Sequence, residues 1–568
     1  MNKIFAAAIS FICCLCAFAE KTVPRVEVTM PFHKGVNLSN WLEPWYGLSV
    51  SSNFFGRQDF EDMKSMGVEI VRVPIHFEAF SSRDPDFVVD EKLWKIIDEA
   101  VGWCTELKLY MIIDMHNDCN GATKTRPDVE VMLNKIWPQI AERYKNSSEY
   151  ILYEIHNEPH FKSGNLNADI AKWGKIQGRI LKLIRTIDTK HTVIVGAENW
   201  NNIEALLKLP DYEDDNIIYN FHDYSPFFFT HQGAAWTDLK NIKNIPFPYD
   251  KDKMPPFPKK ESPSVKQLYE NYEHDSSEEV ICKPLDYAVN FANKRKVALM
   301  CNEFGVDMTH PDKQERINWY SLKNKWMDER NIIRISWDYK ASFGIFNTGS
   351  FSQQFPQDVN VDLIEAMGYK MPKGVQPRTT GWLKNSYENG EYRIFRNKLA
   401  KNILPVSYLN GGKSTAAFDA VSENKETCIS VPKAKPYETV RFNFLGEENL
   451  EPLVNDSLSL EFEVKTAQKD FKLDVYFLNK EDLSKGKDGL EWRCKISLGP
   501  KDKVNDGKWH KVKVPLKDFE DCGAWSNSMN RWFPGEGLFK WNKLCQLVID
   551  FSDNGQNKEV CFKNILIK

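Results

Sequence analysis

Eight short apolar runs alternate with helical patterns between about residues 33 and 370 of this chain. Most runs are continuously apolar, which is typical of strands that are covered on both faces. Between them, residues 90–104 and 168–187 repeat apolar side chains at intervals of three and four, as amphipathic helices do. The pattern predicts an α/β fold, a (β/α)₈ barrel of the TIM type. The expected strands are Gly35–Leu38, Val68–His76, Leu109–His116, Tyr150–His156, Thr192–Ala197, Ile217–Phe221, Lys296–Cys301 and Ile332–Trp337.

Two stretches depart from this alternation and divide the chain. After the sixth expected strand, a segment from Trp236 to about Asp286 is rich in Pro, Lys and Glu. So long a connection is a lid, a small subdomain or a disordered segment, and its place on the rim favours a cleft wall. Residues 372–389 are polar and hold Gly, Pro and Thr, which indicates a linker. We therefore expect the barrel over residues 20–371.

Residues 390–568 have a different pattern, with short alternating segments separated by turn signals such as Asn505-Asp506-Gly507. Several short strands with this punctuation predict a smaller, all-β sandwich, jelly-roll-like in type. Its tryptophans include candidates for stacking on sugar rings, although most of them could equally pack in the core. The candidates are Trp492, Trp509, Trp525, Trp532 and Trp541.

Residues 1–19 have the three parts of a secretory signal: Lys3, an apolar run and an Ala17-Phe18-Ala19 cleavage site. We therefore expect an exported protein without a membrane span. The net charge of −4 gives no basic field for nucleic acid. Beyond the signal, the nine cysteines include no C-x-x-C pair, so no structural zinc is expected. Buried free thiols are the main expectation, and one or two disulfides in the C-terminal part are the alternative.

Two glutamates end apolar runs at positions that a barrel would bring together. Glu158 lies in His156-Asn157-Glu158-Pro159 and Glu303 lies in Asn302-Glu303-Phe304-Gly305. In this fold the carboxyl ends of the strands form one rim, which carries the active site. Two carboxylates facing each other across a sugar are what glycoside hydrolysis requires. Arg72 lies inside an apolar run, where a buried cation needs an anionic partner, and Glu303 could be that partner. The charge of Arg72 would then keep Glu303 ionised, while Glu158 keeps its proton.

Other interpretations of the rim residues stay open at this level. Spacing alone does not exclude Asp114, Glu154 or Glu198 from the catalytic role. His156 and His160 flank Glu158 at a metal-ligand spacing, but Pro159 and the strand context argue against the helix of such a site. We therefore expect neither a metal nor a cofactor.

The order of the motifs resembles that of glycoside hydrolase family 5, the cellulase family of retaining (β/α)₈ enzymes, and especially its compact clostridial-type endoglucanases. The resemblance covers about residues 33–370. The matching pieces are 35–41, 71–74, 114–116, 157–159, 219–222, 226–232, 302–305 and 336–337. The sandwich resembles the carbohydrate-binding modules of such enzymes in general pattern.

This resemblance implies a role for each matching residue. Glu158 would be the acid/base and Glu303 the nucleophile. Asn157 would bond the sugar 2-hydroxyl, and Arg72 and Tyr224 would bond the nucleophile. The residues that would bind substrate are Asn37, Trp41, His116, His222 and Trp337.

The resulting expectation is a secreted, monomeric endo-β-1,4-glucanase whose partner is a polysaccharide. Mixed-linkage β-glucan, mannan, xylan and β-1,3-glucan are alternative substrates. An alternative of another class is a non-catalytic glucan-binding protein, whose mark would be a replaced carboxylate; neither carboxylate is replaced.

Overall fold

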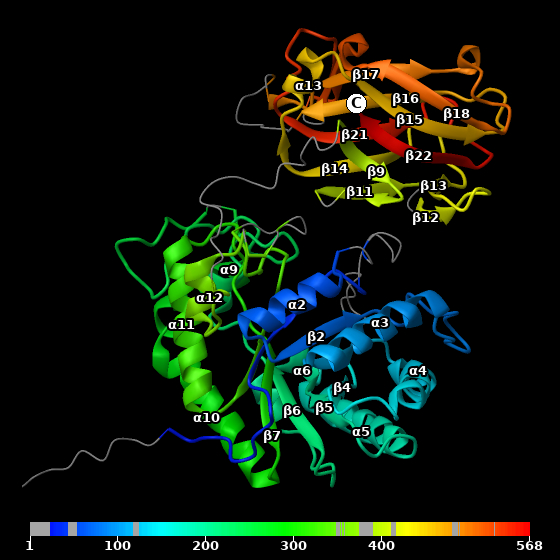
Figure 1. The fold of residues 1–568 in the computed structure, drawn as a ribbon. Helices are drawn as coiled ribbons and strands as arrows, with labels where there is room; N and C mark the ends of the chain where they lie inside the picture. Colours follow the sequence, from blue (N-terminus) through cyan, green and yellow to red (C-terminus); the bar gives the residue numbers. More distant parts are fainter. Residues whose placement is uncertain are drawn as a thin grey trace, which may run out of the picture.

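The computed structural model describes residues 23–43, 51, 54–116, 124–258, 260–347, 353, 355–356, 358–373, 390–400, 402–409, 416–479, 487, 489–526 and 529–568. The expected signal segment and most of the expected linker lie outside these residues. The described chain forms a barrel followed by a β-sandwich (Figure 1). The exact domain boundaries at 371 and 390 stay predictions.

Eight parallel strands close into a barrel, which confirms the predicted fold. Each strand pairs with the next, and the eighth pairs with the first through Val36 and Ser336. The eight observed strands follow the apolar runs, although five of them are one to three residues shorter than the predicted ranges. They are β1 (Lys34–Asn37), β2 (Ile70–Ile75), β3 (Tyr110–Met115), β4 (Ile151–Glu154), β5 (Thr192–Gly196), β6 (Ile217–His222), β7 (Ala298–Glu303) and β8 (Ile333–Ser336).

Helices follow the strands and cover the outside of the barrel (Figure 1). Several begin at a side-chain cap; Asp90, for example, accepts a hydrogen bond from the Lys92 backbone amide, which satisfies a free donor of the first turn. The helices are α2 (Arg57–Met66), α3 (Glu91–Leu107), α4 (Val129–Tyr144), α5 (Leu166–Arg185), α6 (Glu198–Asn201), α7 (Ile203–Leu206), α8 (Phe227–Thr230), α9 (Pro263–Asp275), α10 (Glu278–Arg295), α11 (Lys313–Glu329) and α12 (Val361–Ala366).

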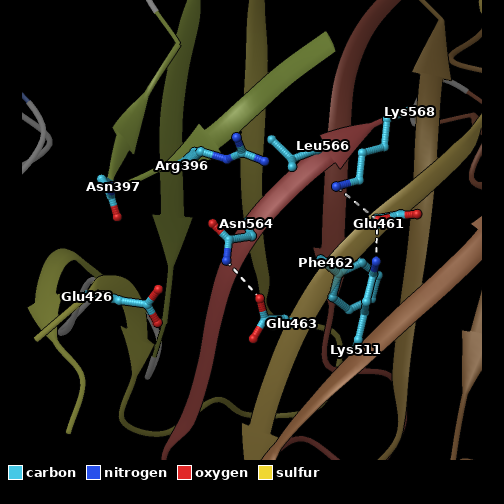
Figure 2. Close-up of a pocket in the computed structure, with 10 residues that line it drawn as sticks. All are labelled: Arg396, Asn397, Glu426, Glu461, Phe462, Glu463, Lys511, Asn564, Leu566 and Lys568. Carbon is cyan, nitrogen blue, oxygen red and sulfur yellow. Dashed lines mark hydrogen bonds and ion pairs between the residues drawn. The ribbon is translucent and has the colours of Figure 1, made fainter. Parts of the chain in front are cut away.

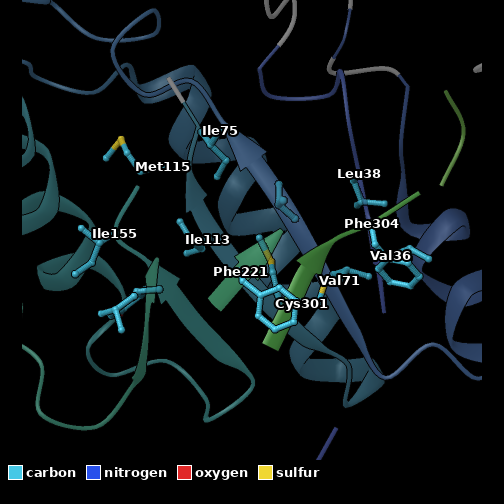
Figure 3. Packing of buried hydrophobic residues seen from close by; sticks show 14 of the residues in the cluster. Val36, Leu38, Val71, Ile75, Ile113, Met115, Ile155, Phe221, Cys301 and Phe304 are labelled. Atoms are coloured by element: carbon cyan, nitrogen blue, oxygen red, sulfur yellow. The ribbon is translucent and has the colours of Figure 1, made fainter. Parts of the chain in front are cut away.

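Alternation along the strands separates an apolar layer from a polar one. Side chains that face the helices, such as Val71, Ile113 and Cys301, pack in one large core (Figure 3). Inward side chains form a second apolar cluster that includes Ile70, Ile112, Leu152 and Ile218. Two residues further along the same strands, the same face of each strand carries Arg72, Asp114, Glu154 and Asn220, all fully buried. The barrel interior therefore changes from apolar to charged toward the carboxyl ends of its strands.

The segment expected as an insertion is shorter than its composition indicates. Helix α10 begins at Glu278 and contacts β7 as the helix of the sixth unit, so the extra chain ends near Ser277 rather than Asp286. The proline-rich part packs onto the barrel: Ile245 and Phe247 are buried, and the Tyr272 hydroxyl donates to the Pro246 carbonyl at 2.6 Å. Its described residues are thus a packed wall rather than a disordered loop.

The C-terminal region is the predicted β-sandwich of two antiparallel sheets. One has the order β10-β9-β22-β13-β12, with β15 against β22 and β18 against β15; the other has the order β11-β14-β21-β16-β17-β19-β20. The strands are β9 (Tyr392–Arg396), β10 (Lys398–Leu399), β11 (Ile403–Tyr408), β12 (Ala417–Val421), β13 (Thr427–Val431), β14 (Thr439–Glu448), β15 (Ser459–Thr466), β16 (Leu473–Asn479), β17 (Arg493–Leu498), β18 (Trp509–Pro515), β19 (Glu520–Ser526), β20 (Arg531–Phe533), β21 (Leu544–Asp550) and β22 (Val560–Ile567).

Two further findings concern the chain as a whole. The structure describes eight cysteines, of which five are buried free thiols: Cys104, Cys282, Cys301, Cys428 and Cys494. Among the helices that the structure describes, none has the length and apolar character needed to cross a membrane.

Candidate active site

Arg72 is the centre of the polar layer inside the barrel. Its guanidinium donates to Glu154 at 2.7 and 3.0 Å and to Glu303 at 2.7 Å, and it lies 2.9 Å from an oxygen of Asp114. Burial alone would lower the pKa of Arg72, but Asp114, Glu154 and Glu303 together raise it well above its ordinary value. The guanidinium is therefore a permanent positive charge beneath the rim.

The three carboxylates around Arg72 differ in their protonation. Burial raises the pKa of Asp114 to about 7 although Arg72 opposes this shift, and burial also raises the pKa of Glu154. Burial would raise the pKa of Glu303 too, but His222 and Arg72 outweigh it and hold this pKa below its ordinary value. Of the three, Glu303 is thus the one held in the ionised form.

Glu303 is held at both carboxylate oxygens. Oε1 accepts from Arg72 at 2.7 Å, and Oε2 accepts from the Tyr224 hydroxyl at 2.9 Å. The side chain is 6% exposed, at the carboxyl end of β7. Burial and the negative charge of Glu303 raise the pKa of Tyr224 well above its ordinary value, so the phenol keeps the proton that it donates.

Glu158 lies just beyond β4 and is more open, with a side chain that is 25% exposed. Its backbone has a φ of 42°, in the left-handed region that costs an L-residue about 1–2 kcal/mol. His222 Nδ1 lies 2.7 Å from Glu158 Oε1 and 3.5 Å from Glu303 Oε2. Burial would lower the pKa of His222, but Glu303 and the hydrogen bond to Glu158 raise it. One imidazole therefore contacts both glutamates.

The two glutamates are close enough to act on one bond. One carboxylate oxygen of each, together with a ring nitrogen of His222, lies within 4.8 Å of the others. Retaining glycosidases place their two carboxyl groups about 5–5.5 Å apart, and inverting ones about 6.5–9.5 Å. The spacing fits the retaining arrangement. Three such ligand atoms would also suit a cation, but Arg72 already supplies the positive charge against Glu303.

Amide and imidazole side chains complete the rim between β3 and β4. Asn157 Oδ1 accepts from Arg72 at 2.8 Å, and its Nδ2 lies 3.3 Å from His116 Nε2. The other nitrogen of His116 lies 2.7 Å from Asp114. Burial and Arg72 lower the pKa of His116 to about 4, so its ring is neutral near pH 7. Trp337, partly exposed, is stacked with this ring at 5.8 Å and 17°.

Two residues expected to bind substrate lie below the surface. Asn37 is fully buried; its amide donates to the carbonyls of Asn302 and Ser336, and its oxygen accepts from Arg72 at 2.9 Å. Trp41 is also fully buried and packs against Phe55 and Phe60. In this structure neither reaches solvent, so we interpret Asn37 as a support for Arg72 and Trp41 as a core residue.

The competing carboxylates are placed apart from the reactive pair. Asp114 and Glu154 are fully buried against Arg72. Glu198, the first residue of α6, is 2% exposed and accepts from the Phe161 backbone amide at 2.9 Å. Only Glu158 and Glu303, among the rim carboxylates named here, share the contact with His222.

Two exposed aromatic side chains that the sequence pattern did not assign to the site are linked to it through ring contacts. Trp236, 63% exposed, lies 6.2 Å from Phe343, which packs against Tyr224. Trp200, 41% exposed, is stacked on His160 at 4.6 Å, and the His160 ring lies 2.6 Å from the Glu158 carbonyl. The signal for Trp200 was its place two residues after Glu198, at the end of the fifth apolar run.

The closed barrel, its charged interior and the two glutamates at its rim define the chain as a glycoside hydrolase of the (β/α)₈ class. Residues 31–342 match the family model described as Cellulase (glycosyl hydrolase family 5), so the chain belongs to this family.

Two curated relatives are each similar to more than half of the chain. Endoglucanase 3 of Fibrobacter succinogenes is 31% identical over 365 residues, which are 60% of this chain and 55% of the relative. Endoglucanase C of Acetivibrio thermocellus is 30% identical over 329 residues, 56% of this chain and 94% of the relative. The chain thus spans just over half of the first relative and nearly all of the second. A solved structure, endoglucanase Cel5A of Thermotoga maritima, has 27% identity and a TM-score of 0.47 over 59% of this chain and 96% of its own.

Proposed function

We propose that this protein is a retaining endo-β-1,4-glucanase that hydrolyses internal bonds of cellulose or a related β-glucan. The observation that carries the proposal is the close pair of Glu158 and Glu303, of which only the second is bound by Arg72 and Tyr224. This difference in contacts would let Glu303 act as the attacking carboxylate and Glu158 as the proton donor, which are the two roles that double displacement requires.

In the first step, Glu303 attacks the anomeric carbon while Glu158 gives its proton to the glycosidic oxygen. The carbon–oxygen bond breaks, the shortened polymer leaves as an alcohol, and the sugar is joined to Glu303 as an ester. Arg72 and Tyr224 hold Glu303 ionised and in position for this attack. We expect Asn157, which Arg72 holds at 2.8 Å, to bond the 2-hydroxyl of the same sugar.

In the second step, the carboxylate of Glu158 takes a proton from water, and the water oxygen attacks the anomeric carbon. The ester bond breaks, Glu303 returns to its ionised form, and Glu158 is again protonated. Two inversions at one carbon leave the product with the configuration of the substrate. We expect Trp337, partly exposed beside His116, to stack under the sugar next to the cleaved bond.

The names of both curated relatives, which are endoglucanases, support a glucan as the substrate, and the match to the cellulase family model supports β-1,4 linkages. The residues that would distinguish glucan from mannan, xylan or a β-1,3 linkage lie on the rim loops, which vary independently of the catalytic pair. Reducing-sugar assays on carboxymethylcellulose, mixed-linkage β-glucan, mannan, xylan and β-1,3-glucan test this choice. We expect the highest kcat/KM on a β-1,4-linked glucan, and faster hydrolysis of mannan or xylan would overturn the substrate proposal.

The catalytic proposal is tested by Glu303→Ala in the full chain. We expect loss of carboxymethylcellulose hydrolysis with an unchanged circular dichroism spectrum. Glu204→Ala, which removes an exposed carboxylate on α7, is the matched control and should keep wild-type activity. Full activity in Glu303→Ala would refute the mechanism.

We also infer that the protein is exported as a monomer and that its sandwich binds carbohydrate. Support for export is the signal-like sequence of residues 1–19. Amino-terminal sequencing of the exported protein should begin at Glu20, and a start at Met1 would contradict export by cleavage. Light scattering of the purified protein should give a mass near that of one chain.

A further inference from the structure

Two tryptophans stand side by side on the outer face of the sandwich hairpin formed by β19 and β20. Trp525 and Trp532 are directly opposite each other in the strand pairing, and they are 40% and 42% exposed. The neighbouring positions, Ala524 and Phe533, point inward and are buried in a small cluster with Trp492. The inward residues anchor the hairpin, so the two indoles are held outward by packing behind them.

The same face continues from the hairpin across the sheet. Arg493 is paired with Gly523 on β19 and with Leu478 on β16; Leu478 is paired with Gln546, and Gln546 with Asn443. Residues that are opposite in adjacent strands lie on one face of a sheet. The Arg493 guanidinium lies 4.9 Å from the Trp532 ring and 5.0 Å from the Tyr476 ring, which confirms that these side chains share the face.

Hydrogen-bonding groups on this face lack partners. The side-chain oxygens of Asn443 and Gln546 are buried and have no hydrogen-bond partner among the residues that the structure describes. Both oxygens and the Tyr476 ring, which is 4% exposed, are enclosed. The exposed part of the face is therefore the pair of indole rings, with the Arg493 guanidinium beside Trp532.

We propose that this face binds a β-linked glucan chain through its exposed part, Trp525 and Trp532 with Arg493 beside them. A pyranose ring presents apolar C–H faces and hydroxyl edges, which match the indole rings and the guanidinium group respectively. The glucan is chosen as the occupant because the barrel of the same chain is proposed to act on it, so this inference rests on the proposed function.

The opposite sheet carries a pocket of about 310 Å³ that is a weaker candidate. Figure 2 shows Glu461 joined to two lysines: it pairs with Lys511 at 2.8 Å and with Lys568 at 3.4 Å. Its aromatic ring, Phe462, is 3% exposed and belongs to the sandwich core. The pocket thus offers paired charges and no exposed ring, and it serves as the control surface.

The test uses the full chain with the double substitution Trp525→Ala/Trp532→Ala. Retention on microcrystalline cellulose and migration in gels containing mixed-linkage β-glucan are measured, with hydrolysis of soluble carboxymethylcellulose as a separate readout. We expect at least a tenfold loss of retention or of gel retardation in one of the two glucans, while soluble hydrolysis and the melting temperature stay unchanged. Both substituted side chains are exposed and belong to the sandwich, so we expect the fold and the activity of the barrel to be unaffected.

Two control variants make the outcome specific. Tyr437→Ala removes a 69% exposed ring elsewhere on the sandwich, and Lys511→Ala alters the charged pocket. Both should bind as the wild type does. Wild-type binding of the double variant to both glucans, or an equal loss in Tyr437→Ala, would overturn the proposal. If neither the wild type nor any variant hydrolyses soluble carboxymethylcellulose, the result would instead count against the proposed function of the barrel.

Discussion

At the scale of single residues, Arg72 and Tyr224 make two glutamates chemically different. Both contact Glu303, and neither has a described contact with Glu158. Glu158 is instead bonded to His222 and is four times as exposed as Glu303, at 25% against 6%. These contacts enclose Glu303 in its ionised form and leave Glu158 more open, which is the difference that the proposed mechanism uses.

Tyr224→Phe should lower kcat/KM by about 10- to 100-fold, since a hydrogen bond to a charged group contributes about 1.5–3 kcal/mol. The Tyr224 hydroxyl helps to lower the pKa of Glu303, so its loss raises that pKa. The acidic limb of the pH–rate profile should therefore move to higher pH. An unchanged acidic limb, measured with a soluble substrate, would show that Tyr224 does not control the ionisation of Glu303.

Arg72→Met should destabilise the fold by about 3–5 kcal/mol, because it leaves buried carboxylates without their cation. Without Arg72 the folded-state pKa values of Asp114 and Glu154 rise further above their unfolded values. The variant should therefore be most stable at acidic pH and should lose stability as the pH rises through those folded-state values. Urea unfolding at pH 5 and pH 8 measures this, and equal stability of the variant at both would contradict the account.

At the scale of elements, the strand ends place the chemistry and the loops that follow shape the cleft. Glu303 ends β7, His222 ends β6, and Glu158 follows β4. The loop after β6 carries Tyr224 and then the packed wall whose residue Trp236 is 63% exposed. A ring held this way beside Phe343 is placed to stack on a sugar further along the polymer.

Trp236→Ala should raise KM for a polymeric glucan severalfold and change kcat less, because the ring is apart from the reacting carboxylates. Tyr287→Ala removes a 49% exposed ring on α10 and is the matched control, with unchanged kinetics expected. Steady-state kinetics on mixed-linkage β-glucan compare the two. A fall in kcat with constant KM would instead place Trp236 in the chemical step.

The sequence was sufficient to predict the strands and the position of the two glutamates at their ends, because both depend on the local pattern of apolar residues. Continuous apolar runs predict buried parallel strands, and a barrel brings their trailing ends together. The burial of individual side chains was not predictable in the same way. Asn37 and Trp41 lie in a motif that resembles the family, yet packing against neighbouring residues buries both. Exposure of Trp200 and Trp236 likewise depends on tertiary contacts, and the true end of the insertion depends on where α10 packs.

At the scale of the whole molecule, the chain has two hydrophobic cores, one around the barrel and one between the sandwich sheets. Phe54 packs against both, and Lys92 of α3 forms an ion pair with Asp419 of β12. Because each part has a hydrophobic core of its own, we expect the barrel and the sandwich to fold independently of each other.

Calorimetry of the full chain should therefore show two unfolding transitions, each matched by the separate fragment 20–371 or 390–568. The barrel fragment should keep hydrolysis of soluble glucan. A single transition together with unfolded fragments would show that the two parts depend on each other.

The central claim, that Glu303 attacks the sugar while Glu158 moves the proton, is tested most directly by trapping the ester. A 2-deoxy-2-fluoro cellobioside with a good leaving group slows the second step more than the first, so the sugar should accumulate on the enzyme. Peptide mass spectrometry should then find stoichiometric labelling on Glu303. Labelling of Glu158, Asp114 or Glu154 in place of Glu303 would contradict the account.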